Sequence, residues 1–354
     1  MPTTPEIIPI AEYVRRLKPL LPDEAFASCP SKLLVPIIHL LLLAGGYIAI
    51  RFSDHWLVWL LCSLVIGHSL ACMGFFAHEV SHNAIFRRPR IRYAFEVVCW
   101  GLNLVSPTIW RRVHNQTHHL YSNTFGDPDR LFLMSEACQT TLWYSRIFYP
   151  NQDSSKWNFG VRFHFIAYIL RNTIAAFYPN RTKPILVPAK PDYTRADRLA
   201  VSLELIAIVV FQVAIFNSVD SSLARFIFAS PIPVLITSTI VMSYIFTNHF
   251  LNPMTKATDP LVSTTSIVVH PIFDRLHLNF SYHTEHHIFP GMNSNFYPAV
   301  SNLLNDVYGD RYHRVSFGEA WDRLWKIQLY APDELRSNTM HKALLTNEGN
   351  TAPR

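Results

Sequence analysis

Three short histidine clusters constrain this chain more than any other feature of its sequence. The third cluster, within Ser281–Gly291, reads H-x-x-H-H and contains His283, His286 and His287. On an α-helix, residues at i, i+3 and i+4 lie on one face, so these three imidazoles can converge. Adjacent residues point about 100° apart around the helix axis. The doubled histidine can therefore serve two neighbouring metal ions, and imidazole suits Fe, Zn, Cu and Ni.

Two earlier clusters repeat this pattern. The first is H-x-x-x-H at His78 and His82, and the second is H-x-x-x-H-H at His114, His118 and His119. A single histidine on an apolar face is usually a packed core residue, whereas three spaced clusters predict one shared metal site. A tetrahedral zinc ion takes four ligands, so eight imidazoles favour two metal ions with four or five nitrogens each.

Several residues near the clusters have the chemistry to support such a site. His249, in Thr-Asn-His after the last long apolar segment, is a candidate ninth ligand, and Asn248 could hold a water molecule. Ligating histidines usually donate their second N–H to a carboxylate or carbonyl. Four carboxylates lie in or beside the clusters and are candidates for that role: Glu79, Asp127, Asp129 and Glu285. Gly126 and Pro128 also predict a turn around the two aspartates.

The composition is that of a membrane protein. Charged residues make up 16% of the chain, against about a quarter in a soluble domain. Four apolar segments, near 33–50, 56–77, 199–216 and 226–246, are long enough to cross about 30 Å of hydrocarbon as helices. Pro231 and Pro233 predict a kink or a delayed start in the fourth. His68 and Glu204 lie within these segments, where ionisable groups are functional candidates.

The positions of the clusters determine the predicted topology. Two weaker apolar patches, near 93–110 and 161–178, are interpreted as interfacial, because a crossing at the first would separate two clusters. The sequence thus predicts an all-α integral membrane protein, with two hairpins of spans and a helical cap that carries the histidines. The basic residues fall mainly on the cap side, so the clusters and both termini are expected to be cytoplasmic.

The remaining features define the domain boundaries and the compartment. Residues 1–31 read as an amphipathic interfacial segment, 32–330 as the catalytic domain, and 331–354 as a C-terminal tail. The net charge of +6 is not concentrated in a dense run, so no nucleic-acid partner is predicted. The five cysteines form no C-x-x-C and read as buried apolar residues in a reducing compartment.

The chain resembles the membrane fatty acid desaturase superfamily over about residues 35–325. The resemblance depends on the three clusters in this order around two hairpins, with Asn123, Gly126–Asp129 and Ile288–Gly291. It implies a non-haem di-iron enzyme that uses O2 and a fatty acyl substrate, with the eight cluster histidines and His249 as iron ligands and Asn123 among the outer residues. The resemblance also implies an external electron donor, of ferredoxin or cytochrome type with its reductase. The sequence shows no H-P-G-G segment of a fused cytochrome domain at either end. Many bacterial members share this form, which indicates a bacterial inner membrane.

The sequence alone leaves the product of the reaction open. Abstraction of C–H hydrogens to give an alkene in the acyl chain is one reading. Oxidative decarboxylation of free fatty acids to terminal 1-alkenes is the alternative, because Ser281–Asn293 also resembles the bacterial membrane decarboxylases; hydroxylation ranks behind both. A free carboxylate would need a nearby cation, and Arg111 and Arg112 are candidates.

Two other classes of protein are alternative interpretations of the sequence: a zinc protease and a metal transporter. His78 to His82 also satisfies H-E-x-x-H, the pattern of zinc proteases. A metal transporter would distribute its ligands along a transmembrane path. The doubled histidines and their clustering argue against both.

Overall fold

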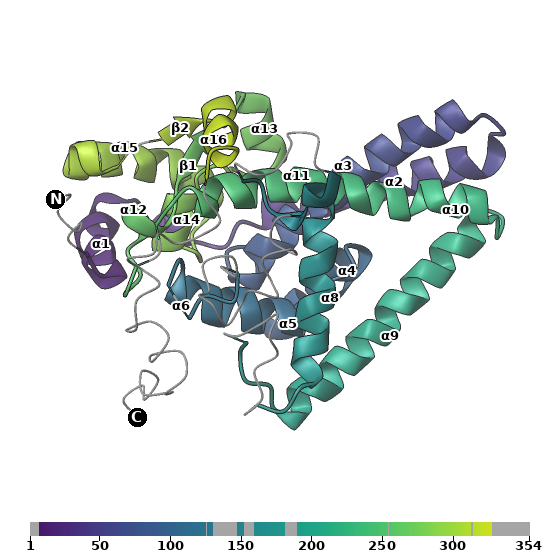
Figure 1. Cartoon of the computed structure of the whole chain (residues 1–354), viewed down its shortest axis with the longest axis horizontal. Coiled ribbons are helices and arrows are strands. Elements are labelled where there is room, and N and C mark those ends of the chain that lie inside the picture. Colours follow the sequence, from purple (N-terminus) through teal and green to yellow (C-terminus); the bar gives the residue numbers. More distant parts are fainter. Residues whose placement is uncertain are drawn as a thin grey trace.

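The computed structural model describes most of the chain, and the described part is mostly helical (Figure 1). The described ranges are 7–124, 126–129, 147–151, 159–180, 190–253, 255–312 and 314–327. The predicted tail at 331–354 and Cys138 therefore lie outside the described residues. Two short strands, β1 (Ser266–Val268) and β2 (Arg314–Ser316), pair in parallel, which is a small departure from the predicted all-α fold.

Four helical stretches are long and apolar enough to cross a membrane: Pro30–Phe52, Trp56–Ser81, Arg195–Ser218 and Leu223–Phe250. Each contains one of the predicted spans. In order along the chain, their main helices are α2 (Leu34–Phe52), α3 (Trp56–Ser81), α9 (Arg195–Ser218), α10 (Leu223–Ala229) and α11 (Pro231–Ile245), followed by the π-helical turn η7 (Phe246–Phe250). The second and fourth stretches extend past the predicted spans by one turn at the ends that carry His78 and His249.

The fourth stretch is broken where prolines predicted a kink. Ser230, between α10 and α11, has φ −136° and ψ −68°, which is not helical. Pro231 follows directly and Pro233 comes two residues later; a proline has no N–H to continue a preceding helix. The helix is therefore interrupted at Ser230, between α10 and α11.

Helix α3 packs between α2 and α11, and the contact with α11 is very close at Gly67. A Cβ at Gly67 would lie 2.7 Å from Cβ of Ile236 and 2.8 Å from the carbonyl oxygen of Pro233. Small residues allow such close approach between helices in membranes. Glycine is therefore required here by the packing of the two helices.

The substitution Gly67→Ala is expected to lower the free energy of unfolding by about 1–3 kcal/mol, as overpacking does. A lower midpoint of thermal unfolding in detergent would show it. Gly45→Ala is the matched control, because no heavy atom lies within 4 Å of a Cβ placed at Gly45 on α2. Equal midpoints for the two variants would contradict the close α3–α11 contact.

The loops that end α2 and α9 lie together at one end of the molecule, on the right in Figure 1. Arg225 donates to Asp54 over 3.0 Å and pairs with Asp220 at 3.3 Å. Arg51 also approaches Asp220, at 3.8 Å. These ion pairs are exposed and contribute little stability, but they show that the two loops share one end.

The two weaker apolar patches form short helices. They are α4 (Pro89–Leu102), α5 (Pro107–Trp110) and α8 (His164–Phe177). A helix of 14 residues, such as α4 or α8, is about 21 Å long, which is less than the hydrocarbon core of about 30 Å. Neither is among the candidate spans of the described chain, as the sequence predicted.

The burial of Glu204 within the apolar helix α9 is explained by its hydrogen bonds. Its carboxylate accepts hydrogen bonds from the hydroxyls of Tyr93 at 2.9 Å and Thr108 at 2.7 Å, from the Thr108 backbone N–H, and from Ser106. The side chain is 3% exposed, and buried carboxylates normally have such partners. Glu204 therefore fastens α9 to α4 and α5.

The C-terminal part of the chain forms a cap at the upper left of Figure 1. Besides the two strands it contains α12 (Pro260–Ser263), α13 (Pro271–Leu276), α14 (His283–Ile288), α15 (Tyr297–Tyr308) and α16 (Phe317–Leu324). The N-terminal helix α1 (Ile10–Leu17) packs on this cap: Tyr13 and Leu17 are fully buried there, and the Tyr13 hydroxyl donates to Asp259 over 2.8 Å. The buried apolar side of the predicted interfacial segment is thus covered by protein.

Candidate metal centre

The nine candidate histidines come from four parts of the fold and meet in one place. They are His78 and His82 at the end of α3, His114, His118 and His119 on the π-helical turn η4 (Arg111–His118) and α6 (His119–Tyr121), His249 on η7, and His283, His286 and His287 on α14. Eight of them are buried and His82 is partly exposed. Segments separated by up to about two hundred residues thus supply a single site.

Five of these histidines form a first group, in which one ligand atom from each lies within 4.8 Å of all the others: His78, His82, His114, His119 and His286. The Nε2 atoms of His78 and His114 are 3.0 Å apart. Nε2 of His119 lies 3.1 Å from Nε2 of His286 and 3.3 Å from that of His114. Nitrogens at this spacing can share one metal ion.

The other four histidines form a second group beside the first. His118, His249 and His287 satisfy the same 4.8 Å criterion. Nε2 of His249 lies 3.2 Å from Nε2 of His118 and 2.7 Å from Nε2 of His283. The two adjacent histidine pairs are therefore split between the groups. His119 and His286 belong to the first group, and His118 and His287 belong to the second. This is the division expected of adjacent residues on one helix.

A π-helical turn determines how the second cluster is divided. The backbone N–H of His119 bonds to the carbonyl of His114, an i→i+5 bond. The wider turn brings His114 and His119 together in the first group, whereas an α-helix would pair His114 with His118. His249, at the end of the fourth apolar stretch, also lies on a π-helical turn. Such turns often occur at functional sites.

Asp127 and Asp129 both lie close to His118. Nδ1 of His118 is 2.9 Å from Oδ1 of Asp127 and 3.6 Å from Oδ2 of Asp129. The other oxygen of Asp127 accepts the backbone N–H of Asn123 at 2.8 Å, and the Asn123 amide donates to the His249 carbonyl at 3.0 Å. Burial and the nearby charge of Asp127 raise the pKa of Asp129 to about 6, against the pull of His118 and Arg171. This arrangement orients His118 and ties it to His249.

The two cluster glutamates have other hydrogen-bond partners. Glu79 forms a buried ion pair with Lys32 at 2.6 Å and accepts a bond from Ser294. Glu285 accepts bonds from Ser266 at 2.5 Å and from Tyr312. The two carboxylates therefore link α3 and α14 to neighbouring segments of the chain. In the described structure, neither carboxylate forms a hydrogen bond with a cluster histidine.

The remaining candidate residues are Asn248 and two arginines, Arg111 and Arg112. The Asn248 side chain is buried, and neither of its amide atoms has a hydrogen-bond partner. Arg111 donates to Glu96 at 2.8 Å, and Arg112 donates to Asp197 at 2.7 Å. Both guanidinium groups are thus engaged with carboxylates.

Sequence reasoning missed two contacts to the histidines. The hydroxyl of Tyr297, on α15, lies 3.1 Å from Nδ1 of His286. The ring of Trp110 stacks on His114 with centroids 4.5 Å apart. The i, i+4 spacing of Trp110 and His114 was a usable signal, whereas nothing in the sequence connects Tyr297 to its histidine.

The histidines are electrostatically suited to bind cations. Burial, reinforced by neighbouring imidazoles, holds the pKa values of His114, His119 and His286 well below 6.5, and lowers the pKa of His82 to about 3. The rings are therefore neutral, the form that binds metals. Nε2 of His82 and both ring nitrogens of His287 are buried without a hydrogen-bond partner. Buried polar atoms normally have partners, and a metal ion in each group would supply them.

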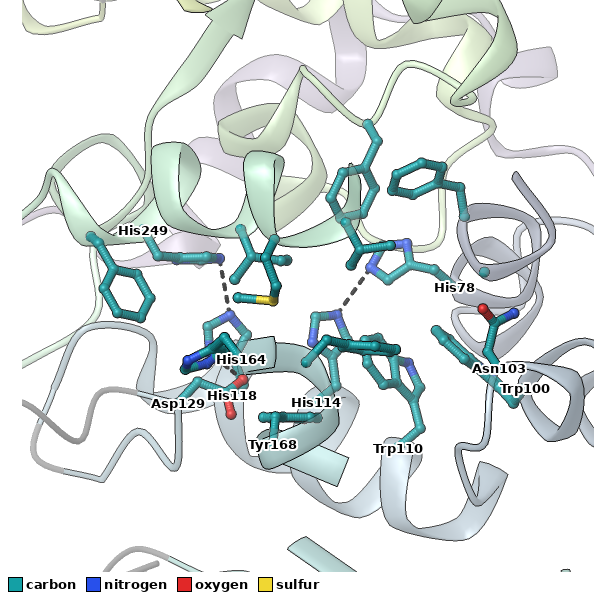
Figure 2. A pocket seen from close by; sticks show the side chains of 18 of the residues that line it. His78, Trp100, Asn103, Trp110, His114, His118, Asp129, His164, Tyr168 and His249 are labelled. Carbon is teal, nitrogen blue, oxygen red and sulfur yellow. Dashed lines mark hydrogen bonds and ion pairs between the residues drawn. The ribbon is translucent and has the colours of Figure 1, made fainter. Parts of the chain in front are cut away.

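A largely apolar pocket adjoins both groups (Figure 2). His78 and His114 of the first group and His118 and His249 of the second line it. Its other walls include Phe75, Trp100, Trp110, Phe165, Tyr168, Val241, Met242, Ile245, Phe250 and Phe280. No Lys or Arg is among the described residues that line it. The pocket can accept an apolar chain directly beside the histidines.

The model of the fatty acid desaturase family matches residues 54–318, which is most of the chain. The chain therefore belongs to the fatty acid desaturase family, as the resemblance predicted. No individual curated protein matches it. Membership makes the protein an oxidoreductase that acts on fatty acyl chains, and the four apolar helices agree with a membrane protein. The family generally uses two iron ions, and the two histidine groups are suited to bind metal.

Proposed function

We propose that the protein is an O2-dependent, non-haem di-iron desaturase that introduces a double bond into a fatty acyl chain. One observation carries the proposal: two adjacent groups of converging, neutral imidazoles open onto one apolar pocket. An acyl chain needs mainly apolar walls, and most of the described lining other than the histidines is apolar.

In this proposal the nine histidines are the iron ligands. The first iron is held by His78, His82, His114, His119 and His286, and the second by His118, His249, His283 and His287. A purely imidazole set suits iron among the first-row metals. The burial of these rings keeps their nitrogens unprotonated at neutral pH, so protons compete weakly with the metal.

When bound, the iron pair with O2 supplies the oxidising power to remove two hydrogens from adjacent methylenes. The reaction balances as R–CH2–CH2–R′ + O2 + 2e⁻ + 2H⁺ → R–CH=CH–R′ + 2H2O. The electrons come from an external donor of ferredoxin or cytochrome type. This donor is part of the proposal.

The protein's own part is positioning and exclusion of water. Phe75, Phe280 and Trp110 form walls of the pocket, and such apolar walls keep water from the reacting carbon atoms. Asp127 orients His118 through Nδ1, and Tyr297 does the same for His286. These outer contacts hold the rings at the angles that the two metal groups require.

The absence of a basic Lys or Arg side chain from the described lining of the pocket supports desaturation rather than decarboxylation. Decarboxylation requires the carboxylate of a free fatty acid beside the metals, and a buried carboxylate pairs with a basic side chain or coordinates a metal ion. The described lining of the pocket offers no Lys or Arg, and Arg111 and Arg112 are paired with Glu96 and Asp197. An uncharged methylene segment fits the same walls without such a partner.

We also propose the membrane topology that the sequence suggested. The four stretches cross as two hairpins within a catalytic domain of residues 32–330, and the cap, the histidines and both termini face the cytoplasm, in a bacterial inner membrane. The paired loops at the opposite end, joined by Arg225 and Asp54, support this arrangement. The positive-inside rule gives its direction.

Product analysis tests the proposal. The protein is expressed in a bacterial host fed defined fatty acids, and lipids and headspace are analysed by gas chromatography–mass spectrometry. An internal alkene with unchanged carbon number is expected, and it should be absent from an inactive His118→Ala variant. A 1-alkene one carbon shorter would replace desaturation with decarboxylation, and a hydroxylated product would contradict both.

A further inference from the structure

A second cluster of metal-binding side chains lies outside the nine histidines. His68 and Cys72 are one turn apart on α3, and His277 follows α13 in the cap. One ligand atom from each lies within 4.8 Å of the other two. Cys72 and His277 are buried, and His68 is partly exposed. Neither the fatty acyl pocket nor the two histidine groups include these residues.

The spacing of the three side chains fits a tetrahedral metal ion. Nε2 of His277 lies 3.3 Å from Nε2 of His68, and Sγ of Cys72 lies 3.9 Å from that same His68 nitrogen. With metal–nitrogen bonds of about 2.0–2.1 Å and metal–sulfur bonds of about 2.3 Å, tetrahedral angles separate two nitrogens by about 3.3 Å and nitrogen from sulfur by about 3.6 Å. These two observed distances exceed the ideal values by at most a few tenths of an ångström, and the ligand atoms of Cys72 and His277 lie within 4.8 Å of each other.

The Nδ1 atom of His277 has a hydrogen-bond partner of the kind that metal-binding histidines usually have. It lies 2.7 Å from the hydroxyl of Tyr244 on α11. A ligating histidine usually donates its second N–H to such an oxygen, which fixes the ring and the tautomer. With Nδ1 as the donor, Nε2 keeps its lone pair, and it lies 3.3 Å from Nε2 of His68.

A third histidine supplies an independent observation. His39, on α2, is 8% exposed, and its Nδ1 is buried without a hydrogen-bond partner. Its ring centroid is 6.3 Å from that of His68. A buried imidazole nitrogen without a partner is unusual, and a metal ion within reach would account for it.

We propose that His68, Cys72 and His277 bind one metal ion of the zinc type, with His39 able to rotate into the fourth position. A thiolate with imidazoles is a ligand set that zinc takes tetrahedrally, and the metal would deprotonate the buried Cys72 thiol. The ion would fasten the cap, through His277, to α3, with α2 and α11 on either side. This site is separate from the proposed iron centre and is independent of the proposed reaction.

The test uses the one chemical difference between the two centres, which is sulfur. The full-length protein is purified from cells grown with Co²⁺, and its electronic absorption and cobalt content are measured. A thiolate bound to Co²⁺ gives a near-ultraviolet charge-transfer band that all-histidine sites cannot give. The wild-type protein is expected to show this band, at an intensity for one thiolate per chain.

Variants assign the band to a particular cysteine. Cys72→Ser, a nearly isosteric change, should abolish it, and His277→Gln should weaken it strongly. Cys62→Ser is the matched control, because Cys62 lies on the same helix and is only partly buried, and it should leave the band unchanged.

Two results would overturn the proposal. One is a wild-type protein without the band, whatever its cobalt content, which would leave Tyr244, His277 and His68 as an ordinary hydrogen-bonded chain. The other is a band that persists in Cys72→Ser. The weaker cobalt bands of all-histidine sites report on the proposed iron centre separately, so failure at one site is distinguishable from failure at the other.

Discussion

Replacing His249 with alanine is expected to remove one of the two irons and to lower the rate of alkene formation by at least about 100-fold. In the structure, Nε2 of His249 lies between those of His118 and His283 at 3.2 and 2.7 Å. The second group would retain three histidines, too few to hold iron firmly. Losing an outer contact alone typically costs about 10–100-fold, so losing a ligand should cost more.

The control for this variant is His55→Ala, which removes an exposed histidine in the loop at the opposite end of the molecule. It should keep two irons and full turnover. Iron per chain is measured together with the rate of product formation. A His249→Ala protein with two irons and more than about a tenth of the activity would show that His249 is not a ligand.

Replacing Asp127 with asparagine is expected to weaken iron binding and turnover by about 10–100-fold, the usual effect of losing an outer carboxylate. Asparagine keeps the shape of the side chain but removes the negative charge that holds His118 at 2.9 Å. The carboxylate also accepts the backbone N–H of Asn123, whose amide contacts His249, so the change reaches two histidines of the second group.

A graded comparison sharpens this prediction. Asp129→Asn should have a smaller effect, since Asp129 lies 3.6 Å from His118. Asp306→Asn, at an exposed position on α15, should have none. Iron binding is measured by titration and turnover by product analysis. If Asp127→Asn behaves like Asp306→Asn, the orientation of His118 does not depend on this carboxylate.

Local spacing accounts for the features that the sequence could predict. The four apolar segments appear at the expected places because about twenty predominantly apolar residues leave little alternative to a spanning helix. The doubled histidines divide between two groups because adjacent side chains diverge on any helix. Asp127 lies near His118 because only eight residues of turn-forming sequence separate them.

Features that depend on distant partners or unusual backbone could not be predicted. The π-helical turn that pairs His114 with His119 has no signal in a single sequence. Arg111 stands beside the second cluster in the chain, yet its guanidinium turns to Glu96, a partner on another helix. Glu79 likewise bonds to Lys32, which precedes α2 in the chain.

The iron content of the active wild-type protein tests the central claim most directly. Purified protein is loaded stepwise with ⁵⁷Fe, and iron per chain is measured beside the rate of alkene formation from a defined acyl substrate with O2 and a reductant. The two histidine groups predict that activity appears only as the second iron binds and is complete at two irons per chain. Full activity with one iron per chain, or with zinc in place of iron, would contradict the proposed di-iron centre.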